Sequence, residues 1–418
     1  MRFVVAGILF AQILFSQTLK DVKNAARQGS QGIPVLTSAL QSQDLAVRVE
    51  AVRQLTLLGG KDSIAPLIQA TRDSDAEVQI RATDGLVNFY LPGYVKTGIG
   101  STLRRVGSSI KGKFTENEQI IDSFVMVRPD VITALGQLAR GGAGMDSRAN
   151  ACRAVGILRG QAAVPDVIDA LKSKDNDVMF EALIALQKIR DPQAGPKVVY
   201  LLRDLDDRVQ AAALETAGLL RAKDALPTLR GIVQSPRNAK SERAALASIA
   251  FMPEEVDRSL LSRYLGAKEE KLRAIAAEGL GRVANRGDEP ALEKFWQEET
   301  KMAPRLAAAF ALVMEGKLQM GEANPLQYLV NTLNSATFRN IAQAYLEEAA
   351  RKQEVRAALY MPLEQGTRDE KIQLSKVLAA SGDAASVPYL DKMSRDNDKD
   401  VAAEGLRALR SLKARLGV

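Results

Sequence analysis

The strongest constraint in this sequence is a unit of about 31 residues that recurs along most of the chain. Pro165, Pro196 and Pro227 stand 31 residues apart, and Val178 and Val209 repeat the same spacing. A fixed period of this length is typical of stacked structural units, each of which is covered by the next. The period therefore predicts one elongated array, where a length of 418 residues would otherwise suggest two or three domains.

Every unit carries the same two signals at the starts of its helices. A proline stands near the start of a first apolar segment, which suits the first turn of a helix because proline has no N–H to satisfy there. An acidic turn follows, for example at residues 73–75 and 204–207, and its Asp side chains are expected to cap a second helix. The initiating prolines include Pro66, Pro165, Pro227 and Pro388.

The second segment of each unit carries a large apolar residue, a small residue four positions later and usually a Leu four positions after that. Residues at this spacing lie along one face of a helix, and the small one allows a neighbouring helix to approach closely. No stretch alternates with the period of a strand. We therefore predict an all-α, right-handed α-solenoid of about ten to twelve antiparallel helix pairs, with one basic insertion. The triplets are Val47, Ala51, Leu55; Val78, Ala82, Leu86; Val178, Ala182, Leu186; Leu272, Ala276, Leu280; and Val401, Gly405, Leu409.

The pattern Asp-x-x-Val-Arg-x-x-Ala-x-x-x-Leu, clearest from Asp44 to Leu55 and echoed from Asp398 to Leu409, resembles the short HEAT repeat of the phycobilisome-lyase type. The resemblance implies an α-solenoid that binds a protein partner. Related repeats occur in bilin-attachment lyases and in deoxyhypusine hydroxylases. The hydroxylases hold iron with His-Glu pairs, and this chain has 0 His.

The N-terminal residues indicate export. Arg2 precedes the apolar run from Phe3 to Phe15, which is the pattern of a signal-peptide core and is too short to span a bilayer as a helix. We expect residues 1–16 to be a signal peptide and the protein to be periplasmic or extracellular. A buried first helix and an uncleaved anchor are the alternatives.

The period fails between residues 92 and 128, so we divide the chain into the signal peptide 1–16, repeats at 17–91, an insertion at 92–128 and repeats at 129–418. The insertion contains an apolar stripe with cations beside it, which is typical of a helix that docks on a membrane surface or a protein. A helix that folds back over its own solenoid is the alternative. The candidate docking residues are Ile99, Leu103, Arg104, Arg105, Val106, Ile110, Lys111, Lys113 and Phe114.

Composition removes most kinds of active site. With 0 His and 1 Cys, the chain has no His-based triad, His-ligated metal or thiolate cage, so we expect no metal and no cofactor. Residues 107–113 resemble a phosphate-binding loop, but Phe114 stands where magnesium would need a Ser or Thr. We expect Cys152 to be a buried packing residue. A net charge of +7 is too small to assign a nucleic-acid partner.

Arginines recur on or near the second helices, at Arg48, Arg81, Arg148, Arg208, Arg243, Arg273 and Arg305. They either line a groove for an acidic partner or pair with acids of neighbouring units, and the second interpretation is favoured. The sequence thus predicts an exported, non-catalytic scaffold that binds a protein in the cell envelope. The alternatives are a lyase-like or chaperone-like protein acting on a partner protein, and a nucleic-acid-binding protein if the N-terminus is not a signal.

Overall fold

The computed structural model describes residues 17–95, 119–122, 124–321 and 323–418, and no strand occurs among them. They form two compact units, the first holding Met1–Gln119 and Val127–Ala170 and the second Ile120–Met126 and Leu171–Val418. The predicted signal peptide and all nine candidate docking residues of the insertion lie outside the described residues.

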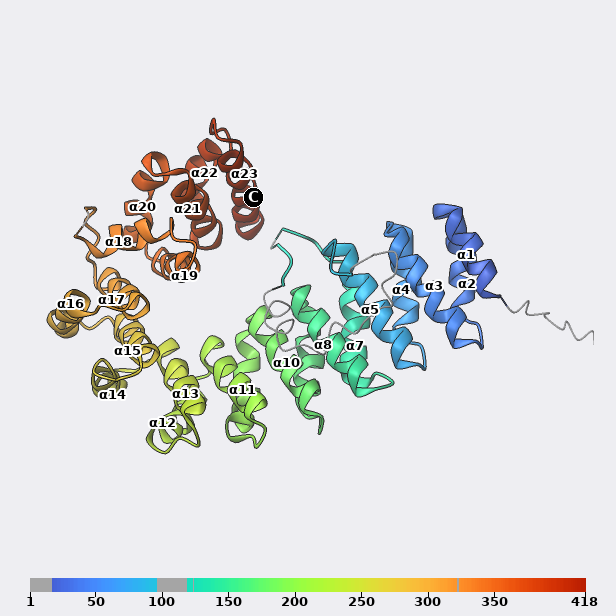
Figure 1. Cartoon of the computed structure of the whole chain (residues 1–418), viewed down its shortest axis with the longest axis horizontal. Coiled ribbons are helices and arrows are strands. Elements are labelled where there is room, and N and C mark those ends of the chain that lie inside the picture. The colour runs from blue at the N-terminus through green and yellow to red at the C-terminus, as the bar shows by residue number, and fades with distance from the viewer. Residues whose placement is uncertain (1–16, 96–118, 123, 322) are drawn as a thin grey trace, which may run out of the picture. The chain divides into compact units, whose positions relative to one another are not determined.

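In the first unit, helices follow one another in chain order as antiparallel pairs (Figure 1). The pairs are α2 with α3, α4 with α5, and α7 with α8, while α1 and α9 flank them. The second helices form a row in which α1 packs on α3, α3 on α5, and α5 on α8. The elements are α1 (Leu19–Arg27), η1 (Gly29–Gly32), α2 (Ile33–Ala39), α3 (Leu45–Leu58), η2 (Lys61–Ser63), α4 (Ile64–Ala70), α5 (Ala76–Tyr90), α7 (Pro129–Gly141), α8 (Met145–Ile157), η3 (Gln161–Ala163) and α9 (Val164–Ala170), where η denotes a 3₁₀ helix.

The second unit continues the scheme, and its second helices, from α10 to α23, again pack in a row. Its elements are α10 (Asn176–Ile189), η4 (Pro192–Arg203), α11 (Asp207–Leu219), η5 (Lys223–Ala225), α12 (Leu226–Gln234), α13 (Ala239–Phe251), η6 (Glu255–Asp257), α14 (Arg258–Tyr264), α15 (Glu270–Val283), η7 (Arg286–Asp288), α16 (Glu289–Glu298), α17 (Met302–Met314), α18 (Pro325–Thr332), α19 (Arg339–Ala349), α20 (Gln353–Gln365), α21 (Arg368–Ser381), η8 (Ala384–Ser386), α22 (Val387–Met393) and α23 (Lys399–Leu416).

These contacts confirm the predicted all-α solenoid. Three pairs in the first unit and seven in the second give ten pairs among the described residues, within the predicted range. The first member of the pair that ends in α11 is the 3₁₀ helix η4, because Gly195 and Pro196 interrupt the α-helical hydrogen bonds there. None of the helices in the described part of the chain is both long and apolar enough to cross a membrane.

The local signals read from the sequence act as predicted. Asp44 caps α3 by accepting a hydrogen bond from the Ala46 amide, and Asp398 caps α23 by accepting from the amides of Asp400 and Val401. The core consists of the predicted triplets, which are at most 8% exposed in the four examples with Ala at the middle position. Cys152 is fully buried in α8, as expected of a packing residue.

Candidate functional site

A repeated arginine ties each acidic turn to the next. The Arg48 guanidinium donates from Nε and Nη2 to Asp73 over 2.8 and 3.2 Å, and from Nη1 to the Ser42 carbonyl over 3.0 Å. Arg273 makes the same bonds to Glu299 over 2.6 and 3.2 Å. Each of these two arginines, which we call rungs, therefore satisfies a carbonyl of its own turn and a carboxylate of the following turn. These bonds fix the spacing of neighbouring helix pairs.

Most of the recurring arginines serve stacking, as the favoured interpretation predicts. Arg48, Arg208, Arg243 and Arg273 pair with acids of neighbouring units. Three do otherwise: Arg81 pairs within its own helix, Arg148 donates to the Ala139 carbonyl, and Arg305 lies over the rings of Trp296 and Tyr328.

One rung shows that the stack is continuous across the insertion. Gln79 occupies the rung position of α5 and is 5% exposed. Its Nε2 donates to the Asp73 carbonyl over 2.6 Å, and its Oε1 accepts from the Ala143 amide over 2.9 Å. This second bond joins residues 64 positions apart, whereas the equivalent bond of Arg48 spans 25. The chain therefore leaves the stack after α5 and returns at α7 without a missing repeat.

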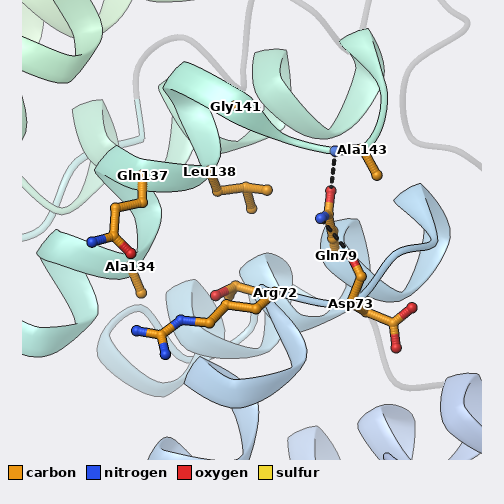
Figure 2. A pocket seen from close by; sticks show the side chains of 9 residues that line it. Arg72, Asp73, Gln79, Ala134, Gln137, Leu138, Gly141 and Ala143 are labelled. Carbon is orange, nitrogen blue, oxygen red and sulfur yellow. Dashed lines mark hydrogen bonds between the residues drawn. The ribbon is translucent and has the colours of Figure 1, made fainter.

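A pocket of about 360 Å³ lies beside this rung in the first unit (Figure 2). One wall comes from the turn between α4 and α5, and the other from α7 and the turn after it. Arg72 is the exposed cation of the pocket, while Asp73 already binds Arg48. The lining therefore offers neither a nucleophile with a base nor converging carboxylates. The lining residues are Thr71, Arg72, Asp73, Gln79, Ala134, Gln137, Leu138, Gly141 and Ala143.

A charged cluster lies in the second unit and joins α15 to α19 across α17. Arg282 is 7% exposed, and its Nε and Nη2 each donate to Glu348 over 2.8 Å. Its Nη1 donates to Glu278 over 3.2 Å, and the Tyr345 hydroxyl donates to the same carboxylate over 2.6 Å. Arg282 and Glu348 are 66 residues apart, so the cluster links the repeat that contains α15 to its second neighbour, which contains α19.

Small residues and aromatic rings make this second-neighbour contact possible. A Cβ on Gly281 would lie only 2.5 Å from the Cα of Ala311, which shows how closely α15 and α17 approach. The fully buried Phe310 ring of α17 stacks on Tyr345 with centroids 4.9 Å apart, and Arg282 lies over it at 5.4 Å. Helix α17 is thereby enclosed, although it occupies a position where other second helices have an exposed side.

The charges of this cluster indicate a structural role and not a catalytic one. Burial raises the pKa of the Tyr345 hydroxyl, and the neighbouring Glu278 raises it further. Burial by itself would raise the pKa of Glu348, but the hydrogen bonds from Arg282 lower it overall. Arg282 thus stays charged and paired with Glu348.

Two buried carboxyls escaped the sequence analysis. Burial raises the pKa of Asp84 to about 6, against a lowering hydrogen bond from Asn150. Burial and the nearby Glu289 raise the pKa of Glu315 to about 7. The Arg282 cluster was missed as well. The all-apolar stretch from Leu306 to Val313 could have indicated that α17 is enclosed, but no sequence pattern identifies the residues that cover this helix.

Part of the insertion is described, and it packs on the second unit. Ile121 is 3% exposed, and both carboxylate oxygens of Asp122 accept from Nη2 of Arg407 in α23, over 2.5 and 2.6 Å. The described residues of this segment therefore group with that unit, and Ile121 lies in its core. The candidate docking stripe from Ile99 to Phe114 stays a prediction.

Comparison with known proteins assigns the repeats. The family described as HEAT repeats matches residues 22–96 and 132–216. These two segments are HEAT repeats. The HEAT-repeat chain is 30% identical over 152 residues to the phycocyanobilin lyase subunit alpha of Nostoc sp. (strain PCC 7120 / SAG 25.82 / UTEX 2576). That similarity covers 34% of this chain and 55% of the relative, so the chain spans about half the length of the curated relative that it matches.

Two solved structures share the helical architecture with this HEAT-repeat protein. The complex of CpcE and CpcF of phycocyanin lyase from Nostoc sp. PCC7120 is 21% identical, with 72% of this chain and 94% of that chain covered at a TM-score of 0.34. The Escherichia coli protein YibA is 15% identical, with 70% and 94% covered at a TM-score of 0.41. Likenesses of this size carry no argument about activity.

Proposed function

We propose that this HEAT-repeat protein is an exported, non-catalytic scaffold that binds another protein in the cell envelope. The observation that carries the proposal is the row of second helices in each unit, whose recurring charges are used mainly to hold neighbouring pairs together. Such rows offer extended surface in place of a closed pocket, and extended surface is what repeat proteins use to bind partners.

The non-catalytic part of the proposal rests on the residues present. The sequence has 0 His, and no three Cys, Asp or Glu side chains among residues 17–95, 119–122, 124–321 and 323–418 are grouped as metal ligands. The Arg282 cluster is fully paired. Purified protein is expected to show no ATPase activity and no stoichiometric metal by mass spectrometry. One bound metal per chain in a clean preparation would overturn this part.

Export and partner binding are tested in the native cell. A chain with a C-terminal tag is expected in the envelope fraction, with a mature N-terminus near residue 17 by Edman sequencing. Cross-linking there, followed by purification of the captured protein, supplies the partner for a binding titration with recombinant chain. A cytoplasmic chain that retains Met1 would refute export, and the lack of any partner with saturable binding would refute the scaffold.

We also propose the insertion as the docking element. Because the Gln79 rung keeps α5 and α7 in register, replacing residues 96–118 with a short Gly-Ser linker should leave the fold intact. The expected melting temperature lies within about 3 °C of wild type, while capture of the partner or of liposomes is lost. Unfolding of the deletion variant, or unchanged capture, would show that the insertion serves packing alone.

A lyase-like role on a partner protein is the second candidate, and it is favoured by the similarity to the phycocyanobilin lyase subunit alpha. Incubation of the chain with phycocyanobilin discriminates the two candidates. Transfer of the pigment to the captured partner, seen as covalent colour on a denaturing gel, would support the lyase. The scaffold predicts no transfer above a control that lacks the HEAT-repeat chain.

A further inference from the structure

An arginine recurs at one strained backbone position of the repeat. Arg159, Arg190 and Arg221 are 31 residues apart, and each follows the end of a second helix with a positive φ of 51°, 60° and 52°. Gly59 stands at the corresponding place after α3, with φ of 61°. Glycine is the residue that adopts this conformation without steric penalty. Ala284 adopts the same conformation after α15, with φ of 55°, so the conformation belongs to the repeat and the arginine side chain is an additional feature of three of its copies.

Two of these arginines lie on adjacent helices of the second unit and are not used for stacking. Arg190 ends α10 and Arg221 follows α11, and these two helices pack together. Both side chains are exposed, and neither makes a hydrogen bond or ion pair with any described residue. They differ in this from Arg48 and Arg273, whose guanidinium groups bind the next turn.

Both arginines lie near carboxylates of α19, a helix of the same unit (Figure 1). Arg190, Arg351 and Lys376 lie close enough to Glu347 for their charges to lower its pKa, against the burial that raises it. Arg221 and Arg351 act in the same way on Glu348, which Arg282 already binds.

The basic patch, defined as Arg190, Arg221, Arg351 and Lys376, therefore carries an excess of positive charge. Three of these cations, Arg190, Arg351 and Lys376, act on Glu347, which accepts a hydrogen bond from Gln343 over 2.7 Å. Arg221 and Arg351 act on Glu348. Clustered charges of one sign attract an oppositely charged partner more strongly than isolated surface charges do.

We propose that the basic patch binds an acidic, extended segment of the partner protein. Arg190 and Arg221 are exposed and follow two helices that pack together, so an extended segment with several carboxylates suits them better than a single small anion. The proposal rests on the scaffold function above and specifies its surface and the chemistry of its partner.

The test uses the full mature chain and a fluorescein-labelled (Glu-Gly-Ser)₅ peptide, with (Gln-Gly-Ser)₅ as the neutral counterpart. Fluorescence anisotropy is expected to show saturable binding of the acidic peptide that weakens with salt, and no binding of the neutral one. Replacing both arginines with glycine (R190G/R221G) should reduce the affinity for the acidic peptide at least tenfold. Glycine also relieves the positive φ, so this variant should melt at or above the wild-type temperature.

A matched control separates the patch from overall charge. R72E/R286E reverses two exposed arginines elsewhere and should bind the acidic peptide within about twofold of wild type, whereas R190E/R221E, with the same change in net charge, should abolish binding. Equal losses in both variants, or unchanged binding by R190G/R221G, would overturn the proposal. Tighter binding of a single-stranded oligonucleotide than of the peptide would assign the patch to nucleic acid and also overturn it.

Failure of this inference is distinguishable from failure of the scaffold function. If the cross-linked partner binds R190G/R221G as tightly as wild type, the patch assignment is wrong and the scaffold stands. If no partner is found and the acidic peptide still binds in the manner described, the patch is confirmed as a binding surface and the envelope function is wrong.

Discussion

The stability of this protein should depend on pH through Glu315. This residue follows the last turn of α17 and is 9% exposed, and neither of its carboxylate oxygens has a hydrogen-bond partner among the described residues. The charges nearest to it are mostly negative, from Glu289, Asp288 and Glu293. A nearby cation, Lys317, binds Glu289 over 2.7 Å and Glu293 over 2.9 Å.

The size and sign of the effect follow from the pKa. Burial, with Glu289 next in importance, raises the pKa of Glu315 from 4.5 to about 7 in the folded chain. Because one pKa unit corresponds to about 1.4 kcal/mol, the ionised side chain should cost the folded state about 3 kcal/mol. Below pH 4.5 the carboxyl is neutral in both states and this cost is absent. Stability is then lost as the pH rises from about 4.5 to about 7, and the full cost is present above that range.

Replacement by the neutral isostere tests this directly. Glu315→Gln and wild type should have similar free energies of unfolding at about pH 4 or below, and the variant should be about 3 kcal/mol more stable at pH 8. Urea denaturation followed by circular dichroism measures the difference. Glu354→Gln, on the exposed side of α20, is the matched control and should show no pH-dependent gain. A variant that is no more stable than wild type at pH 8 would refute the reasoning.

Two further predictions concern the contact across α17. Gly281→Ala should lower the free energy of unfolding in urea by about 1–2 kcal/mol, since overlap with the Ala311 backbone outweighs the better helix propensity of Ala. The control is Gly141→Ala, whose added Cβ would have no atom within 4 Å and which should be neutral or stabilising. Arg282→Ala should lower the free energy of unfolding by about 3–5 kcal/mol because two carboxylates lose their partner. Glu348→Gln keeps a hydrogen-bond acceptor and should cost less. Equal losses of stability in these two variants would contradict the ion-pair account.

Part of the candidate site could be predicted from the sequence. The rung arginines, such as Arg48, repeat with the turn aspartates at a nearly constant separation, so their pairing follows from the period. The candidate docking residues of the insertion do not belong to that period, and no described contact places them. The basic patch lies between these cases: its 31-residue spacing is visible in the sequence, but the strained backbone of Arg190 and Arg221 is not.

The sequence by itself determined the helices, their caps and their buried faces, because these depend on residues within one repeat. Asp44 caps α3 through an amide two residues away, and Val47, Ala51 and Leu55 share a face because a helix has 3.6 residues per turn. Only the tertiary structure decided which repeats meet beyond their neighbours. The bond from Arg282 to Glu348 depends on how closely α17 lets α15 and α19 approach. Small differences in packing accumulate from pair to pair. The curvature of the stack, which decides which distant groups face one another, therefore depends on all the repeats together.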